Sequence, residues 1–317
     1  MSGRLPVERF HHGALLYAGM DEFLAGTIAF IREGIVASEP VLVVVGAPKI
    51  AALKARLGAD AGHVQFKNMA EVGANPARII PAWHDFVESQ AVTGRPFRGI
   101  GEPIYPERSA VELIECQRHE ALLNVAFDGG PAWRLLCPYD TTALAPDVVE
   151  EAHRSHPYVA YDHTYTASGL YAEAATARAP FTAALPEPSH LRATLVFDGM
   201  GLRPVRRLVS TEAARAGYTS GPIADLVMAV DEVATNSIRH GGGAGRLRIW
   251  PDGDVLVCEI RDRGHFDDPL ADRRRPAPGR DGRRGLWLAN QLCDLVQVRS
   301  FATATTVRLH MHRDRTR

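Results

Sequence analysis

The chain has 317 residues, of which 46% are hydrophobic and 23% charged, and its formal net charge is −1. This length allows two ordinary domains, and the near-zero charge gives no reason to expect direct binding of nucleic acid or a membrane. Its longest apolar run, residues 41–45, is too short to span a bilayer, and the N-terminus lacks a signal-peptide pattern. The four cysteines, Cys116, Cys137, Cys258 and Cys293, are widely spaced. We therefore expect a cytoplasmic protein with reduced thiols.

Helical and strand-like segments alternate in the first half of the chain, which predicts an α/β domain. Residues 21–37 carry apolar side chains at helical spacing, and Asp21 is a candidate cap for this helix. Residues 41–45 are all Val or Leu, as in a strand that is buried on both faces of a parallel sheet. Later patterns predict helices over 76–90 and 107–127 and a strand over 133–138.

The loop after the 41–45 strand is where a phosphate-binding loop would lie. It reads Gly-Ala-Pro-Lys-Ile over residues 46–50, with no second glycine and no Lys-Ser/Thr pair. We therefore predict a P-loop-like (RecA-like) sheet that lacks a Walker A motif.

Several segments of this domain resemble the MEDS sensory domain, a family named from regulators in methanogens and methylotrophs. The segments are residues 9–17, 75–81, 98–103, 115–124 and 136–140, and the resemblance covers nearly all of residues 9–160. It implies a sensory domain over residues 1–171 that responds to a small molecule or another signal, which the family does not specify.

Two alternative interpretations of this domain, a metal site and a phosphoacceptor histidine, depend on single residues. Cys116 and His119 are three apart on a predicted helix, and Cys137 lies on a strand that could pack nearby, so a metal site is an alternative to a buried thiol and a hydrogen-bonded histidine. His119-Glu120 followed by Asn124 also resembles a phosphoacceptor box of histidine kinases, although that box should directly precede the ATPase. The other histidines, among them His11, His12, His153, His156 and His163, are interpreted as surface or hydrogen-bonded residues.

A linker is predicted over residues 172–189. This segment is rich in alanine and proline, and Pro180, Pro186 and Pro188 prevent a helix from continuing through it.

The remaining residues, 190–317, predict a two-layer α/β sandwich. A Pro-Asp-Gly turn at residues 251–253 indicates a hairpin. The predicted strands are 191–197, 246–250, 254–261, 296–301 and 306–311, and the predicted helices are 202–216, 224–240 and 285–295.

The helix over 224–240 carries a row of polar side chains beside its apolar stripe. Glu232, Asn236 and Arg239 stand at i, i+4 and i+7 and so share one face. A carboxylate can act as a base toward a hydroxyl group, and a carboxamide oxygen suits Mg²⁺. Residues 241–243 are all glycine and end the helix.

Two later motifs complete a candidate nucleotide site. Asp262-Arg-Gly264 follows an apolar strand, where the aspartate could accept the amino group of adenine. Gly282-Arg-Arg-Gly285 opens a helix, whose N-terminal amides favour phosphate oxygens. The loop between them, residues 273–280, is rich in arginine and proline and is predicted to be a lid.

In this order and spacing, the three motifs resemble the ATPase domain shared by histidine kinases, gyrase-type ATPases and anti-sigma kinases (the Bergerat type). The resemblance spans residues 190–312 and is closest to the anti-sigma serine kinases. It implies that Glu232 is the catalytic base, Asn236 the Mg²⁺ ligand and Asp262 the adenine-binding residue. It also implies that the nucleotide is lined by Arg239, Gly264, Gly282, Gly285 and Leu286.

Two positions depart from the family pattern. Arg283 stands where the first glycine of a Gly-x-Gly is expected, and Ala304-Thr305-Thr306 replaces a Gly-Thr pair, so that a methyl group could crowd the pocket.

The sequence as a whole predicts a signal-responsive anti-sigma regulator. It would bind ATP and Mg²⁺ and phosphorylate a serine or threonine of an anti-anti-sigma (STAS-type) partner, while sequestering a sigma factor. A homodimer is expected by analogy. The alternatives are a catalytically weak pseudokinase that only binds its partners and, third, a sensor histidine kinase that uses His119.

Overall fold

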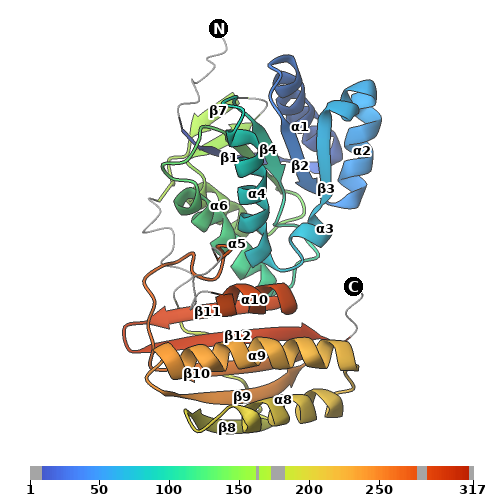
Figure 1. The fold of residues 1–317 in the computed structure, drawn as a ribbon. Helices are drawn as coiled ribbons and strands as arrows, with labels where there is room; N and C mark the ends of the chain where they lie inside the picture. The colour runs from blue at the N-terminus through green and yellow to red at the C-terminus, as the bar shows by residue number, and fades with distance from the viewer. Residues whose placement is uncertain (1–8, 162–163, 173–182, 277–283, 314–317) are drawn as a thin grey trace. The chain divides into compact units, whose positions relative to one another are not determined.

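The alternating pattern of the sequence forms two α/β units, each with its own sheet, in the computed structural model of the chain (Figure 1). The structure describes residues 9–161, 164–172, 183–276 and 284–313. The units are Met1–Phe181 and Thr182–Arg317. The predicted linker, 172–189, spans this boundary, and its residues 173–182 lie outside the described part. Within the described residues, no helix combines the length and the apolar character needed to cross a membrane.

The N-terminal unit is built on a sheet in the order β3-β2-β4-β5-β1-β6-β7, in which only the β6–β7 pair is antiparallel. Its strands are β1 (His11–Tyr17), β2 (Val41–Val45), β3 (Val64–Asn68), β4 (Arg98–Gly101), β5 (Arg134–Asp140), β6 (Tyr158–Tyr161) and β7 (Thr164–Ala167). Its helices are α1 (Gly19–Val36), α2 (Ala47–Leu57), α3 (Met69–Val72), α4 (Ile79–Ala91), α5 (Ala110–Ala126) and α6 (Pro146–Ser155), with 3₁₀ turns at Gly58–His63 and Pro76–Arg78.

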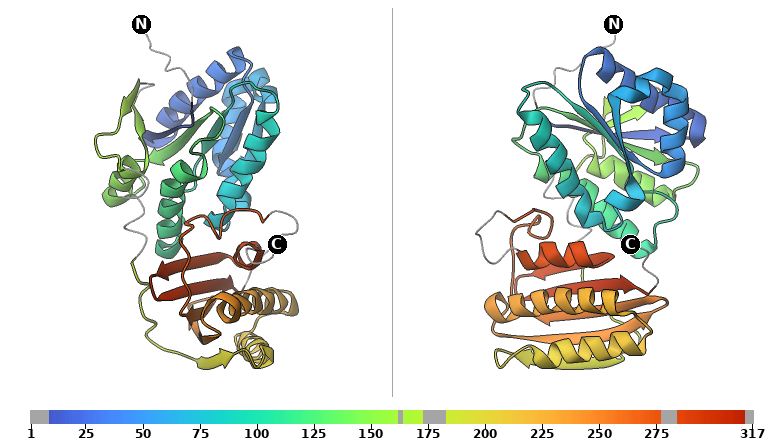
Figure 2. Two further views of the ribbon diagram at one scale, coloured as in Figure 1. Left: turned by 60° about the vertical axis from the view of Figure 1, so that its left-hand side comes forward. Right: turned by 45° about the vertical axis from the view of Figure 1, so that its right-hand side comes forward.

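Helices cover both faces of this sheet, which explains why β2 is apolar at every residue. On one face, Leu15 and Tyr17 of β1 pack into a cluster with Phe23 of α1 and Leu53 of α2. On the other face, the indole of Trp83 from α4 lies against β4, where Gly99 and Gly101 leave room for it. Helix α5 covers the same second face (Figure 2).

The predicted elements of this unit are found with small shifts. Strand β2 occupies the predicted range, and every residue in it is buried. The expected cap of α1 is wrong, because Asp21 lies in its first turn and the backbone N–H of Ala18 donates instead to Glu22 Oε2 at 2.7 Å. The predicted 76–90 helix begins as a 3₁₀ turn, whose Ala77 N–H donates to Asn75 Oδ1.

In the loop after β2, where a phosphate-binding loop would lie, the lysine contacts side chains of the same unit. Lys49 Nζ donates to the carboxylate of Glu102, and it also lies 2.6 Å from the hydroxyl of Tyr17. Burial raises the pKa of Glu102, and the positive charge of Lys49 opposes that rise. Lys49 therefore compensates a buried carboxylate.

The C-terminal unit has an antiparallel sheet in the order β11-β12-β10-β9-β8. Helices cover one face of it, and the result is two layers, as predicted (Figure 2). The strands are β8 (Ala193–Asp198), β9 (Ala244–Asp252), β10 (Val255–Asp262), β11 (Leu295–Phe301) and β12 (Ala304–His312), and the helices are α8 (Arg203–Arg215), α9 (Ser220–His240) and α10 (Arg284–Leu292).

The opposite face of this sheet carries charged side chains. The carboxylate of Glu259 is fully buried there and accepts hydrogen bonds from Arg248 and Arg308. Glu187, from the chain that leads into this unit, pairs with Arg248 and Arg261. Arg248, Arg261 and Arg308 thus surround the buried carboxylate, in keeping with the cost of an unpaired buried charge.

Adding a single methyl group at Gly99 tests the contact between Trp83 and β4. A Cβ at Gly99 would lie 2.6 Å from Cζ3 of Trp83. Because both sides of this contact are buried, we expect Gly99→Ala to lower the free energy of unfolding of the N-terminal unit by about 1–3 kcal/mol. The measurement is urea unfolding followed by circular dichroism. Gly62→Ala, where a Cβ meets nothing within 4 Å, is the control. Equal midpoints for the two variants would contradict the packing.

Candidate functional site

The C-terminal unit contains a cavity of about 550 Å³ between α9, the end of β10, α10 and β12. This volume lies within the usual range for small-molecule sites. Apolar and polar residues line it together: Val233, Asn236, His240, Gly241, Asp262, Gly264, His265, Phe266, Asp267, Asp268, Ala271, Leu286, Thr305 and Val307.

Asp262, the last residue of β10, presents its carboxylate to this cavity in a fixed orientation. Its Oδ2 accepts a hydrogen bond from the hydroxyl of Ser237 on α9 at 2.5 Å. Its Oδ1 accepts one from the backbone N–H of Gly264 at 2.7 Å. Each carboxylate oxygen can accept more than one hydrogen bond, so Asp262 retains the capacity to accept from a ligand.

Close backbone approaches hold this carboxylate in place. A Cβ at Gly241, the residue that ends α9, would lie 2.5 Å from Cγ of Asp262. A Cβ at Gly264 would lie 3.0 Å from Oδ1 of the same side chain. The hydroxyl of Thr305 on β12 donates to the carbonyl of Gly264 at 2.9 Å. The turn after β10 is therefore fastened both to the end of α9 and to β12.

The start of α10 packs closely on the polar row of α9. A Cβ at Gly285 would lie 2.8 Å from Nδ2 of Asn236 and 3.2 Å from Oε2 of Glu232. Only glycine allows this approach. The first N–H groups of a helix have no partner within it, so the approach brings hydrogen-bond donors beside an amide and a carboxylate.

The structure places the predicted site residues as follows. Asn236, Asp262, Gly264 and Leu286 line the cavity, and Glu232 and Gly285 lie beside Asn236. Arg239 is exposed and does not belong to the lining.

The two departures from the family pattern have different outcomes. Ala304 is not part of the lining, where Thr305 and Val307 stand instead, so its methyl group does not crowd this cavity. Arg283 lies outside the described residues, as does Gly282 of the predicted site.

Sequence reasoning missed His240, His265, Phe266 and Asp267 of the lining. The residues of α9 that line the cavity are Val233, Asn236 and His240, at i, i+3 and i+7, and this row omits Arg239. The hydrogen bond from His265 to Asp267, at 2.6 Å, raises the pKa of that imidazole. No sequence pattern indicated His265, Phe266 and Asp267, because the segment after Gly264 has no regular pattern.

The predicted arginine-rich lid is described only as far as residue 276. Arg274 lies 3.6 Å from the carboxylate of Asp268, a lining residue, and Arg273 lies 3.7 Å from Asp272. The first arginines of this loop are thus engaged with its own acidic residues.

Two family models match the chain, one in each unit. Residues 11–157 match the family model of the methanogen/methylotroph DcmR sensory (MEDS) domain, and residues 199–311 match that of the histidine kinase-like ATPase domain. The serine-protein kinase RsbW of Bacillus velezensis is 32% identical over 115 residues, which are 32% of this chain and 72% of that protein. RsbW of Halalkalibacterium halodurans is 30% identical over 125 residues, or 36% of this chain and 77% of that protein. A crystal structure of the RsbU and RsbW domains of a Mycobacterium tuberculosis protein aligns with 22% identity and a TM-score of 0.30, over 39% of this chain and 33% of that one.

The C-terminal unit is therefore a histidine kinase-like ATPase domain, and a MEDS sensory domain precedes it in the chain. Within that class, the chain belongs to the family of the RsbW serine-protein kinases, whose members align with it over more than two thirds of their length.

The packing of α10 on α9 yields a stability test. In Gly285→Ala, the added methyl group must displace Asn236 or Glu232. We expect the free energy of unfolding of the C-terminal unit to fall by about 1–3 kcal/mol in urea titrations. Gly221→Ala adds the same methyl group on α9 at a position with nothing within 4 Å, and it should not destabilise the unit. A Gly285→Ala chain as stable as this control would show that α10 does not approach α9 in this way.

Proposed function

We propose that this chain is a signal-responsive anti-sigma regulator of the partner-switching type. Its C-terminal domain binds ATP with Mg²⁺ and phosphorylates a serine or threonine of an anti-anti-sigma (STAS-type) protein, and it sequesters a sigma factor when that protein is not available to it. The N-terminal MEDS domain, whose sheet we take to be P-loop-like (RecA-like), receives a small-molecule signal and biases this exchange through the linker. The regulator acts in the cytoplasm, as a homodimer by analogy with its class.

One observation carries the proposal: a single cavity joins the carboxylate of Asp262 and the amide of Asn236, next to the start of α10. The residues fit ATP and Mg²⁺ in kind. Val233, Leu286 and Val307 give the cavity apolar walls for a base, and Asp262 is a fixed acceptor for an amino group. The amide oxygen of Asn236 is a hard ligand of the kind Mg²⁺ takes together with water and phosphate.

In this site each residue has a distinct task. Asp262 accepts the adenine amino group and so sets the position of the nucleotide, and Leu286 and Gly264 bound the same space. Asn236 holds the metal ion, and the amides at Gly285 and Gly282 bind phosphate oxygens. Glu232 accepts the proton of the attacking hydroxyl of the partner. Arg239, exposed one turn beyond Asn236, contributes positive charge from outside the cavity. Bound Mg·ATP supplies the phosphoryl group, and catalysis consists mostly of positioning and charge neutralisation.

Nucleotide binding is tested by calorimetry in the presence and absence of Mg²⁺. We expect the wild-type chain to bind ATP, and Asn236→Ala and Asp262→Ala each to weaken binding about ten- to a hundredfold, as the loss of a charge-assisted contact predicts. Asp252→Ala removes an exposed carboxylate from the last residue of β9 and should bind as the wild type does. A folded wild-type chain that binds no ATP would refute the nucleotide site.

Phosphoryl transfer is tested with an anti-anti-sigma protein of the STAS type and labelled ATP. In Glu232→Gln we expect transfer to fall about 10²–10⁴-fold, the usual contribution of a general base, with ATP affinity preserved. Asp252→Asn is the control for a change of the same chemistry. If Glu232→Gln regulates and phosphorylates its partner normally, Glu232 is not the base. If the wild type binds ATP and transfers no phosphate, the chain acts as a pseudokinase.

The histidine-kinase alternative loses support from the position of its proposed phosphoacceptor. His119 lies on α5 with 1% of its surface exposed. A phosphoryl group could reach it only if the N-terminal unit opened, whereas a phosphoacceptor must enter the active site of a kinase domain.

A further inference from the structure

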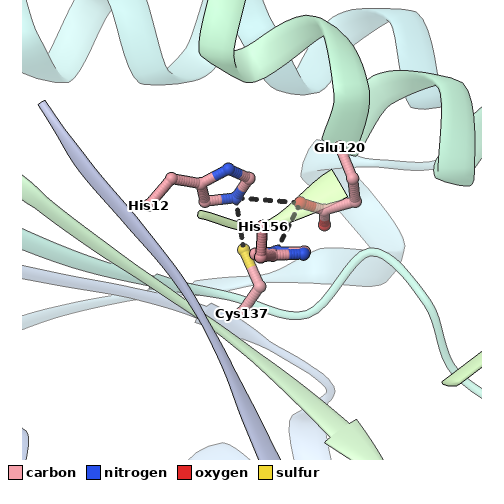
Figure 3. Close-up of side chains that lie close together, drawn as sticks. All are labelled: His12, Glu120, Cys137 and His156. Carbon is pink, nitrogen blue, oxygen red and sulfur yellow. Dashed lines mark hydrogen bonds and ion pairs between the residues drawn. The ribbon is translucent and has the colours of Figure 1, made fainter. Parts of the chain in front are cut away.

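Four side chains of the N-terminal unit that carry metal-binding atoms converge on one point: His12, Glu120, Cys137 and His156 (Figure 3). Nε2 of His12 lies 3.1 Å from Oε2 of Glu120 and 3.4 Å from Sγ of Cys137. Nε2 of His156 lies 3.3 Å from the same Oε2. One ligand atom from each residue lies within 4.8 Å of all the others.

The sheet and its covering helices produce this cluster, since its members are far apart in the sequence. His12 on β1 and Cys137 on β5 belong to paired parallel strands, in which His12 is opposite Leu135 and Ala14 is opposite Cys137. Glu120 comes from α5, and His156 directly follows α6. All four residues are buried, with at most 1% of their surface exposed.

Hydrogen bonds fix which nitrogen of each histidine faces the cluster. Nδ1 of His156 lies 2.8 Å from the carbonyl oxygen of Ala152, which can only accept, so Nδ1 carries a proton and Nε2 is the nitrogen that faces the cluster. Nδ1 of His12 lies 3.1 Å from Oδ1 of Asn124. The Nδ2 group of Asn124 donates to the carbonyl of Ser155, which leaves its oxygen as the acceptor for His12. Nε2 of each histidine therefore faces Glu120, and in the neutral imidazole it carries the lone pair.

This arrangement favours a positive charge at its centre, which a proton on an imidazole or a bound cation can supply. Two imidazole nitrogens face a fully buried carboxylate, and in the described part of the chain His12 and His156 are its ion-pair partners. Oε1 of Glu120 and Nε2 of His156 are buried with no hydrogen-bond partner among the described residues. A divalent cation bound by one carboxylate, one thiolate and two neutral imidazoles would leave a net charge of zero, which is the favourable state for a buried site.

The spacing of the ligand atoms also fits a tetrahedral ion. Bonds of about 2.0–2.3 Å in tetrahedral geometry separate ligand atoms by roughly 3.3–3.7 Å. Three of the separations, 3.1, 3.3 and 3.4 Å, lie at the short end of that range or just below it, and all pairs lie within 4.8 Å. Adjustment of these side chains to tetrahedral spacing would accommodate an ion at their centre.

We propose that His12, Glu120, Cys137 and His156 form a closed four-ligand site for a divalent transition-metal ion, and that Zn²⁺ is the ion it fits best. Nitrogen, sulfur and carboxylate ligands together are typical of zinc, and a thiolate argues against Mg²⁺ or Ca²⁺. Asn124 and the carbonyl of Ala152 orient the two imidazoles from outside the site, as partners of metal-bound histidines commonly do. The ion joins β1, β5, α5 and α6, and it is independent of the nucleotide site.

This site differs from the metal site considered from the sequence. Of Cys116, His119 and Cys137, the cluster contains only Cys137. His12 and His156, which we had interpreted as ordinary surface or hydrogen-bonded histidines, supply its two nitrogen ligands.

The test uses the full chain, produced with added Zn²⁺ or Co²⁺ because a buried site is filled as the protein folds. We expect a single Zn²⁺ per chain by elemental analysis, and in the Co²⁺ form a sulfur-to-metal charge-transfer band in the near ultraviolet. Cys137→Ser should lose both the band and the bound ion. Cys116→Ser, which changes an equally buried thiol on α5 outside the cluster, should retain both. ATP and Mg²⁺ are omitted, so that the C-terminal site does not contribute.

Two further measurements make the outcome decisive. Asn124→Ala keeps all four ligands but frees the His12 ring, and it should weaken Zn²⁺ binding about ten- to a hundredfold. A chelator should lower the unfolding temperature of the wild type and leave that of Cys137→Ser unchanged. A wild-type chain that is folded by circular dichroism and holds no transition metal would overturn the proposal. So would equal loss of metal in Cys116→Ser and Cys137→Ser.

Discussion

The carboxylate of Asp262 is the point on which the architecture of the C-terminal site depends. It is held from two sides, by the hydroxyl of Ser237 on α9 and by the backbone of Gly264 in its own turn. The end of a helix, the end of a strand and a turn thus share one acidic group. This arrangement requires glycine at position 241, because any side chain there would overlap the carboxylate. The glycines of the motifs serve this close packing as much as they serve chain flexibility.

Elements whose signal is local could be predicted from the sequence. The five apolar residues of β2 and the stripe of α9 specify a buried strand and an amphipathic helix by composition and period alone. Asn236 and Asp262 were also accessible to prediction, since each stands at a fixed offset within or directly after such an element. The cavity brings both of them together.

Features that depend on how elements face one another could not be predicted. Arg239 and His240 are adjacent on α9, and only the packing of that helix decides that His240 faces the cavity. The cluster of His12, Glu120 and His156 has no spacing to recognise, since its parts come from a strand, a helix and the residue after another helix. Buried polar residues on different elements become a site only once the sheet has brought them together.

The charged face of the C-terminal sheet has a mechanical consequence. Glu187 is tied to Arg248 and Arg261, and Arg308 donates to the carbonyl of Pro186, so the chain is fastened to β9, β10 and β12 as it enters this unit. Arg261 directly precedes Asp262 on β10. A force on the entering segment would therefore act on β10 one residue away from Asp262, whose carboxylate organises the cavity. Tension, as well as ligand binding, therefore has a short route to the cavity.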